Sequence, residues 1–316
     1  MVLANAQTER LSDHASGVAR AGELLRDGAL VAFPTETVYG LGADARDGKA
    51  VARIYAAKGR PSFNPLIVHV LSLERAQDLA EFNTDALALA QAFWPGPLTL
   101  VLPLRRDAGL SALVTAGLDS VAIRVPGLQL ARAILQAADS PIAAPSANPS
   151  GQISPTEAAH VLAGLDGKID AVLDGGVCGV GLESTIVGVT SMPVLLRPGG
   201  LPVEALEACL GAALAPLIVG EAPNAPGQLT SHYAPQASLR LNAGDVQAGE
   251  RLLGFGPVEA DLNLSYAGDL VEAAANLFHH LHVLDAESCA PIAVSPVPET
   301  GLGLAINDRL KRAAAS

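Results

Sequence analysis

The sequence predicts an α/β protein, and three observations support this fold class. Hydrophobic residues make up 50% of the chain but aromatic residues only 3%, so the core must be built from aliphatic side chains. The 31 glycines and 22 prolines suit a fold with many tight connections. Apolar residues at helical spacing also alternate with short apolar runs. With 316 residues, the chain is long enough for two ordinary domains.

The first half of the chain alternates helical and strand patterns. Residues 17–27 have helical spacing, and the apolar run 29–33 indicates a buried strand that ends at Pro34. There follow a helix at 48–57, a strand at 65–71, helices at 73–82 and 84–93, a strand after the turn W-P-G-P, a strand at 120–125 and a helix at 128–138.

The second half divides at a linker. Short strands are predicted at 171–173 and 185–189, and a third strand ends at Arg197. The segment from about 211 to 228 is rich in proline and glycine and has little periodicity, which predicts a linker. A second α/β pattern then begins, with strands at 238–241, 251–255 and 291–294 and helices at 269–283 and 303–314.

Charge and cysteine content restrict the function classes. The chain has 32 acidic and 20 basic residues, for a net charge of −12, which argues against binding nucleic acid through the general surface but not against a local basic cleft. Its cysteines, Cys178, Cys209 and Cys289, are far apart and lack C-x-x-C spacing, as in a reduced cytosolic protein. There is no signal-peptide pattern, and the apolar stretch 210–219 is too short to span a bilayer. We expect a soluble, cytoplasmic protein.

One stretch, residues 55–70, concentrates polar groups suited to an anion. Lys58 and Arg60 lie in a turn punctuated by glycine and proline, Asn64 follows, and His69 lies in the next strand. Arginine offers a planar fork to phosphate and lysine a point charge. A solvated basic turn explains the same pattern equally well. A single strand histidine such as His69 is more often half-buried and structural than catalytic.

Further polar residues stand at the ends of predicted strands. Thr35, Glu36 and Thr37 follow the strand at 29–33, where α/β sheets place ligand groups, although in isolation an N-cap and turn cluster explains them slightly better. Ser120 and Arg124 share one face of a strand with apolar neighbours. We expect Arg124 to be buried against an anion rather than on the open side of the sheet.

The segment P-I-A-A-P-S-A-N-P-S-G-Q-I-S-P-T reads as a structured polar loop. If it is extended, Ser146 and Asn148 point to the same side. Ser154 begins S-P-T-E, which has the spacing of a helix N-terminus with a capping box. Such an end can bind an anion, or it can be an ordinary cap.

The sequence does not support a cysteine nucleophile or a histidine metal site. No base is paired with Cys178, so we interpret it as a small residue in a turn rather than a nucleophile. His279, His280 and His282 stand at the end of a predicted helix, and their spacing does not bring them to one point. We therefore predict no dedicated metal site.

Five motifs in register identify a resemblance over nearly the whole chain. They are F-P-T-E-T-V-Y-G-L-G, K-G-R-P-x-x-N-P-L-I-V-H, W-P-G-P-L-T-L, A-P-S-A-N-x-S-G and G-x-E-S-T-I-V. In this order they resemble the YrdC-like family, whose members are threonylcarbamoyl-AMP synthases. The later S-H-Y-A-P and G-L-G-L-A-I-N-D-R-L are similar to its longer, two-domain form.

The resemblance implies an activity and an architecture. The enzyme would condense L-threonine, bicarbonate or carbon dioxide, and ATP to threonylcarbamoyl-adenylate with release of pyrophosphate. Mg²⁺ is expected as the cofactor. Partner proteins would use the product to modify an adenosine in tRNA. A twisted open mixed sheet with a concave cleft would form residues 13–210. A linker at 211–236 would cross the active site, and a smaller Rossmann-like domain would form residues 237–316.

The resemblance also assigns residues. Threonine would be held by Thr37, His69, Arg124, Ser184 and the backbone at Ala144. The nucleotide would be held by Lys58, Arg60, Asn64, Ser120, Ser146, Asn148, Ser154 and Arg197, with Tyr233 closing over it from the linker. Lys58 and Arg60 would be catalytic, because they would neutralise charge on the phosphates.

Two alternatives use the same cleft. One is a different carbamoyl transfer, as in hydrogenase-maturation enzymes, but their acylphosphatase and zinc-finger segments are missing from this sequence. The other is an RNA-binding module, which the net charge of −12 and the few aromatic residues disfavour.

Overall fold

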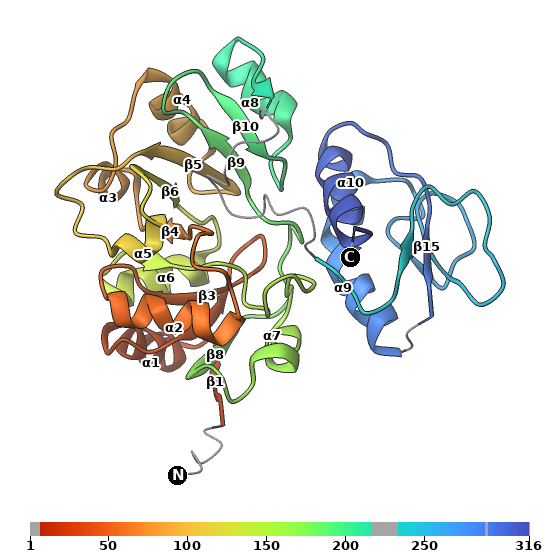
Figure 1. Ribbon diagram of the computed structural model, residues 1–316, viewed down its shortest axis with the longest axis horizontal. Helices are drawn as coiled ribbons and strands as arrows, with labels where there is room; N and C mark the ends of the chain where they lie inside the picture. The colour runs from red at the N-terminus through yellow and green to blue at the C-terminus, as the bar shows by residue number, and fades with distance from the viewer. Residues whose placement is uncertain (1–6, 217–232, 288–289, 316) are drawn as a thin grey trace.

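The computed structural model describes residues 7–216, 233–287 and 290–315, which form a larger and a smaller α/β part (Figure 1). Each part has its own sheet and its own buried apolar cluster. Cys289 and most of the predicted linker, 217–232, lie outside the described residues. Within the described residues, no helix combines the length and the apolar character that crossing a membrane requires.

The larger part is built on an eleven-stranded mixed sheet in the order β1-β8-β2-β3-β7-β4-β6-β5-β9-β10-β11. Parallel and antiparallel neighbours both occur, as in the β4–β6 and β5–β6 pairs. This confirms the predicted α/β fold with an open mixed sheet. The strands are β1 Glu9–Ser12, β2 Val31–Pro34, β3 Tyr39–Asp44, β4 Ile67–His69, β5 Leu98–Pro103, β6 Ser120–Arg124, β7 Ile142–Ala143, β8 Ala171–Asp174, β9 Thr185–Gly188, β10 Val194–Arg197 and β11 Ala215–Pro216.

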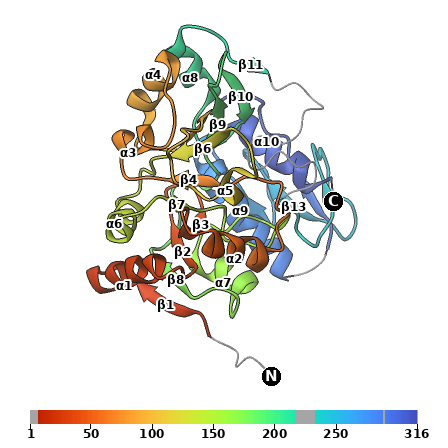
Figure 2. The same ribbon diagram turned by 60° about the vertical axis from the view of Figure 1, so that its left-hand side comes forward.

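Helices cover both faces of this sheet. They are α1 Ala15–Arg26, α2 Gly48–Lys58, α3 Leu73–Gln77, α4 Thr84–Phe93, α5 Ala112–Thr115, α6 Gln129–Ala138, α7 Ala158–Leu165 and α8 Val203–Leu210. Figure 2 shows α1 and α6 together at one side of the molecule. They pack closely because Gly22 has no side chain: a Cβ there would lie 2.5 Å from the Cβ of Ala137. Together with β2 and β8 they enclose one of the apolar clusters.

Alternation along β4 and β6 separates the core from a polar face. Val68 and Ile123 are fully buried in the main apolar cluster. The alternate residues face the other way, and the parallel register places His69 directly beside Arg124. The predicted strand faces are therefore confirmed at these positions. Two polar side chains from distant parts of the sequence meet on one face of the sheet.

The smaller part is a four-stranded parallel sheet in the order β12-β15-β13-β14. Its strands are β12 Leu239–Arg240, β13 Arg251–Gly254, β14 Leu262–Asn263 and β15 Ile292–Val294, and its helices are α9 Leu270–Glu287 and α10 Leu302–Ala313. The sequence predicted these elements except β14, whose two residues are too few to show a period. In the larger part it also missed β3, where the glycines of Y-G-L-G resemble a turn.

The two parts are in direct contact. Helices α9 and α10 of the smaller part face the larger one (Figure 1). Gly181 packs against α9, and a Cβ at this position would lie 2.4 Å from the carbonyl oxygen of Ala274. The apolar cluster of the smaller part includes Val38, Ile153 and Leu182 of the larger part. The interface therefore continues the core of the smaller part.

Candidate active site

A pocket opens on the polar face of the large sheet, beside the contact with the smaller part. Nine of the predicted site residues line it: Thr37, Arg60, His69, Arg124, Ala144, Ser146, Ser184, Arg197 and Tyr233. Thr35, Val38, Gly40, Ile67, Pro145 and Glu183 complete the lining. The other predicted residues, Lys58, Asn64, Ser120, Asn148 and Ser154, do not line it. Three arginines and one carboxylate on its wall give the pocket a cationic character.

Arg124 holds one wall of the pocket together. Its Nη1 donates to Thr37 Oγ1 at 2.8 Å, its Nη2 lies 2.6 Å from Glu36 Oε1, and its Nε donates to the Gly96 carbonyl at 3.2 Å. The anion expected beside Arg124 is thus supplied by the chain itself, as Glu36. Burial acts to raise the pKa of Glu36, but the charge and hydrogen bond of Arg124, together with backbone hydrogen bonds such as that from Gly127, hold the pKa below its ordinary value.

His69 lies beside Arg124 and is almost fully buried. Burial, aided by the charge of Arg124, lowers its pKa to about 3, so the imidazole is neutral at physiological pH. Its Nδ1 is buried without a hydrogen-bond partner among the residues that the structure describes. A neutral ring with an unused nitrogen next to a guanidinium can contact a polar ligand.

Lys58 and Arg60 stand at the end of α2, where Gly59 turns the chain with a φ of 60°. Lys58 Nζ donates to the carbonyls of Ser146, at 2.6 Å, and of Asn148. Arg60 donates to the carbonyls of Asn64, at 3.2 Å, and Pro65, at 2.9 Å. Burial lowers the pKa of Lys58 well below its usual value and that of Arg60 to about 10.

These two buried cations make contacts to neutral carbonyls and, among the described residues, no ion pair with a carboxylate. A buried charge without a counter-ion is costly, and a bound anion would compensate for it. Lys58 also ties the end of α2 to the 146–148 loop, a structural role that sequence reasoning did not foresee.

Arg197 and Ser184 form a further wall. Arg197 Nη2 donates to the Ser184 carbonyl at 2.8 Å, and Ser184 Oγ lies 2.7 Å from Thr99 Oγ1. Burial lowers the pKa of Arg197. Both residues are buried at the ends of neighbouring strands, with Arg197 closing β10 and Ser184 preceding β9.

The structure corrects the prediction that a helix begins at Ser154. Helix α7 begins at Ala158, not at Ser154, and the residue at its N-cap, Glu157, makes no capping hydrogen bond with its side chain. Ser154 instead donates from Oγ to Glu183 Oε1 at 2.5 Å. The S-P-T-E spacing is therefore not a capping box, because the carboxylate of Glu183 takes the serine hydroxyl.

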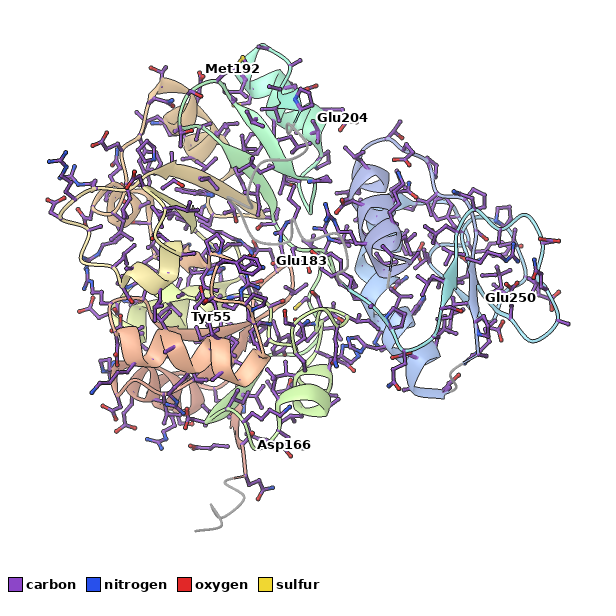
Figure 3. The ribbon with its side chains drawn as sticks, viewed as in Figure 1. Tyr55, Asp166, Glu183, Met192, Glu204 and Glu250 are labelled. Atoms are coloured by element: carbon purple, nitrogen blue, oxygen red, sulfur yellow. The ribbon has the colours of Figure 1, made fainter. Side chains whose placement is uncertain are left out.

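Sequence reasoning missed Glu183 and Arg309, which form a buried ion pair across the interface. Arg309 of α10 donates from Nε to Glu183 Oε2 at 2.8 Å, and Figure 3 shows Glu183 between the two parts. Burial acts to raise the pKa of Glu183, but Arg309 and then Arg197 hold it at about 2. Glu183 lies in the motif G-x-E-S-T-I-V and Arg309 in I-N-D-R-L. A charged residue within each motif was the signal that could have pointed to them.

Tyr233 reaches the pocket from the smaller part and is buried there. Its ring stacks on Phe278 of α9, with 5.5 Å between the ring centroids, and the Arg309 guanidinium lies 5.1 Å from the ring centroid. Next to it, the Ala234 N–H donates to the Gly151 carbonyl at 2.8 Å. Both parts of the molecule thus enclose the pocket.

The remaining candidates lie outside the lining. Asn64 and Asn148 are buried, and the Oδ1 of each lacks a partner among the described residues. Ser120 begins β6, at the opposite end of the strand from Arg124. Cys178 is buried, and burial raises its pKa to about 12, which agrees with its interpretation as a structural residue.

Comparison with known proteins identifies the family of this chain. A family model of the Sua5, YciO and YrdC proteins, described as telomere recombination, matches residues 23–199. The model of the threonylcarbamoyl-AMP synthase C-terminal domain matches residues 201–315. A threonylcarbamoyl-AMP synthase from Pyrococcus abyssi is 44% identical over 93% of this chain and 92% of its own. The chain belongs to the threonylcarbamoyl-AMP synthase family. The resemblance found in the motifs is confirmed.

Other members of the family agree with this assignment. A threonylcarbamoyl-AMP synthase from Bacillus subtilis is 44% identical over 97% of this chain and 95% of its own. The crystal structure of P. abyssi Sua5 complexed with L-threonine superposes with a TM-score of 0.89 at 40% identity, over 97% of each chain. HypF, at 17% identity and a TM-score of 0.53 over 59% of this chain, shares the fold alone.

Proposed function

We propose that this chain condenses L-threonine, bicarbonate or carbon dioxide, and ATP to threonylcarbamoyl-adenylate and releases pyrophosphate. The observation that carries the proposal is the pair of buried cations Lys58 and Arg60, which the protein leaves without a carboxylate partner among the described residues. They stand beside a pocket with a second, arginine-held polar wall. Family membership supports the same assignment.

The Arg124 wall would hold threonine. A guanidinium has about five N–H donors, and the contacts with Glu36, Thr37 and Gly96 use three of them, so two can bind the threonine carboxylate. Neutral His69 would contact the amino acid next to it, and Thr37, Ser184 and the Ala144 backbone would supply further polar contacts. The neighbour in the comparisons that is complexed with L-threonine supports a threonine site in this fold.

The cationic wall would hold ATP. Arg60 and Arg197 line the pocket and would contact the phosphates directly, and Ser146, which also lines it, would add a hydroxyl contact. Lys58 would add its charge from behind the 146–148 loop and hold that loop in position. Asn64, Ser120, Asn148 and Ser154 do not line the pocket, so any contact with the nucleotide would need a shift of the adjacent loops.

The reaction needs positioning and charge neutralisation, without a covalent nucleophile. The threonine amine attacks carbon dioxide and loses a proton, which gives a carbamate. A carbamate oxygen then attacks the α-phosphorus of ATP, and the bond to pyrophosphate breaks. Arg60, Arg197 and Lys58 would stabilise the negative charge that develops on the phosphates.

Magnesium would enter with the nucleotide. The carboxylates beside the pocket, Glu36 and Glu183, are engaged by Arg124 and Arg309, so they are poor candidates to form a separate cage for the ion. Mg²⁺ commonly keeps several waters and binds mainly through substrate phosphates in such sites. We therefore treat the Mg²⁺–ATP complex as the substrate.

Enclosure of the pocket would protect the product. A mixed anhydride of a carbamate and a phosphate hydrolyses readily, so the site must exclude water. Tyr233, buried between Phe278 and Arg309, would form the cover. We propose the division into a catalytic domain at 13–210, a linker at 211–236 that crosses the site, and a small domain at 237–316; residues 217–232 of that linker lie outside the described residues.

The product would serve tRNA modification in the cytoplasm. Separate transfer proteins would pass the threonylcarbamoyl group from the adenylate to an adenosine of tRNA. The net charge of −12 makes direct binding of tRNA by the general surface unfavourable.

Pyrophosphate release with single omissions tests the proposal. The purified chain is supplied with Mg²⁺–ATP, threonine and bicarbonate, and each substrate is left out in turn, with carbon dioxide removed from the buffer in the bicarbonate arm. We expect release only when all three are present. Pyrophosphate release at the same rate without threonine would contradict the proposal.

A further inference from the structure

Three of the seven histidines of the chain meet at the interface between the two parts, and a fourth, His280, adjoins one of them. His160 lies on α7 of the larger part, and His279, His280 and His282 lie on α9 of the smaller part. The rings of His160 and His282 stack with 3.8 Å between their centroids, and the ring of His279 lies 5.6 Å from that of His160. Such a concentration of imidazoles serves no step of the proposed reaction.

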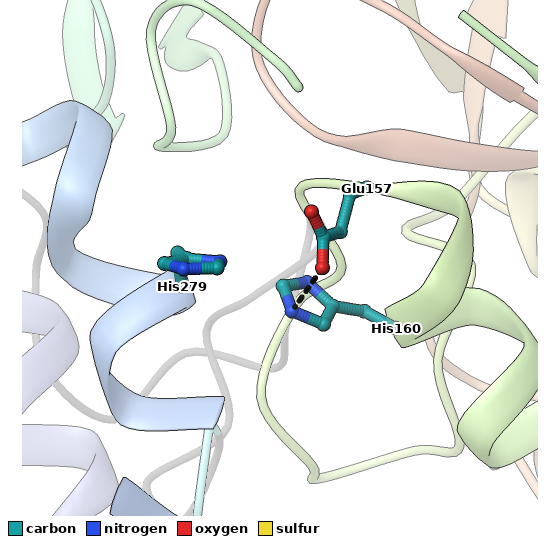
Figure 4. Close-up of side chains that lie close together, drawn as sticks. All are labelled: Glu157, His160 and His279. Atoms are coloured by element: carbon teal, nitrogen blue, oxygen red, sulfur yellow. Dashed lines mark ion pairs between the residues drawn. The ribbon is translucent and has the colours of Figure 1, made fainter. Parts of the chain in front are cut away.

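A carboxylate completes the cluster. Glu157, three residues before His160, turns its side chain toward the imidazole, and His279 approaches from α9 on the other side (Figure 4). One ligand atom from each of the three residues lies within 4.8 Å of the other two. His160 Nε2 and Glu157 Oε1 are 3.2 Å apart. Zinc binds nitrogen and oxygen at about 2.0–2.2 Å, which places neighbouring ligand atoms of a tetrahedral site roughly 3.3 Å apart.

We propose that Glu157, His160 and His279 bind a zinc-type divalent cation, with water as the fourth ligand, and that this ion bridges α7 and α9. Two imidazoles and one carboxylate favour Zn²⁺, Co²⁺ or Ni²⁺ over Mg²⁺ or Ca²⁺, which prefer oxygen ligands throughout. The ion is therefore different from the magnesium that accompanies ATP. The trio His279, His280 and His282 does not itself form the site, since two of the three ligands are Glu157, at the N-cap of α7, and His160, in α7.

Thr156 lies against the other nitrogen of the His160 ring. His160 Nδ1 accepts from the Thr156 N–H at 3.3 Å and lies 3.4 Å from Thr156 Oγ1, so Nε2 carries the proton that faces Glu157. Binding of the ion through Nε2 would move the proton to Nδ1, where Thr156 Oγ1 would replace the Thr156 N–H as its partner. Such an outer contact fixes the tautomer of a ligating histidine.

The neighbouring histidines have other roles. His282 donates from Nε2 to the Ser154 carbonyl at 3.1 Å and stacks on His160, so it supports the ligand ring. His279 has a buried Nδ1 without a partner among the described residues, so no hydrogen bond there competes for the ring. The site thus adjoins Ser154, which binds the pocket residue Glu183. The ion would hold α9 against the segment that leads to the pocket.

Metal titration of the full-length, tag-free chain tests the site. The protein is stripped with chelator, desalted, and titrated with Zn²⁺ by calorimetry and with Co²⁺ by visible absorption. We expect about one equivalent to bind, with the Co²⁺ spectrum of a tetrahedral site and a rise in Tm. Even outer-shell changes cost about 10–100-fold in affinity, so His160→Ala and His279→Ala should each lose at least that much. The proposal would be overturned if the wild type did not bind the ion, or if both variants bound it with wild-type affinity.

The control is His280→Ala, on the same helix turn as His279 but outside the three-residue group. It should bind Zn²⁺ with wild-type affinity and show the same rise in Tm. If His160→Ala fails to fold, Glu157→Gln and His279→Asn test the same point with little change in volume, and circular dichroism checks their fold. Binding that only His280→Ala abolishes would also overturn the proposal.

Discussion

Arg309 Nε lies 2.8 Å from Glu183 Oε2, and this buried ion pair joins the last helix of the chain to the wall of the pocket. The Arg309 side chain is 0% exposed and that of Glu183 8%. Glu183 also accepts the hydroxyl of Ser154, and Arg309 also donates to the Pro198 carbonyl. Because Glu183 is part of the pocket, the position of the smaller part affects the shape of the site.

Removal of Arg309 should strongly destabilise the contact between the two parts. In Arg309→Ala, Glu183 loses its direct ion-pair partner, and the loss of one partner from a buried pair costs about 3–5 kcal/mol. Urea unfolding should show a lower midpoint for the variant. The matched control is Lys311→Ala on the same helix, whose ion pair with Glu299 is exposed and should contribute at most about 1 kcal/mol. Equal midpoints for the two variants would contradict a structural role for the pair.

Arg60→Ala should lose most of the catalytic activity while the fold remains intact. A single contact that stabilises charge in the transition state contributes about 2.7–4 kcal/mol, or about 10²–10³ in kcat. Initial rates of pyrophosphate release measure the effect, and thermal unfolding checks the fold. Arg53→Ala on α2 is the control, since its ion pair with Asp170 is partly exposed and away from the pocket. A variant with near-normal turnover would remove Arg60 from the catalytic role.

Arg124→Lys should weaken threonine binding. Lysine keeps the charge but cannot hold Glu36, Thr37 and a carboxylate at once, because it lacks the planar fork. A hydrogen bond to a charged group contributes about 1.5–3 kcal/mol, so the Kd for threonine should rise about 10- to 150-fold. Calorimetry measures this Kd, and ATP binding to the same variant is the internal control. An unchanged threonine Kd would show that Arg124 only supports the pocket.

His69 should make the protein less stable as the pH falls. Its folded pKa of about 3 lies below the ordinary 6.5, so between these values the unfolded chain binds the additional proton. Stability should therefore decrease from pH 6.5 downward, by about 1.4 kcal/mol per pH unit for this group. Urea unfolding at pH 7, 6 and 5 should show a smaller decrease in His69→Gln than in wild type. Parallel curves would mean that the pKa of His69 is the same in the folded and the unfolded state, which would contradict the lowered value.

Sequence periodicity predicted the elements of the fold better than their contacts. The alternation in 120–125 placed Arg124 on the face opposite Ile123, because a strand has a period of two in any sheet. It could not show that His69 pairs with Arg124, since β4 and β6 meet only through the parallel register of the folded sheet. Strand β14 could not be predicted, because two residues are too few to show an alternating pattern.

The candidate site shows the same limit. Motif resemblance selected nine residues that line one pocket, but it could not rank their contacts. Lys58 turned out to hold backbone carbonyls, and Ser154 gave its hydroxyl to Glu183 rather than to a helix end. Glu183 and Arg309 are 126 positions apart, so no local pattern connects them. The Glu157, His160 and His279 group likewise draws on two parts of the fold.

The most direct test of the account is the fate of labelled carbon in the product. The chain is incubated with Mg²⁺–ATP, threonine and ¹³C-bicarbonate, and the products are analysed by mass spectrometry. The account predicts a threonylcarbamoyl-adenylate that carries the label in its carbamoyl group, in amounts equal to the pyrophosphate released. Pyrophosphate without this adduct, or an adenylate formed directly on the threonine carboxylate without label, would contradict it.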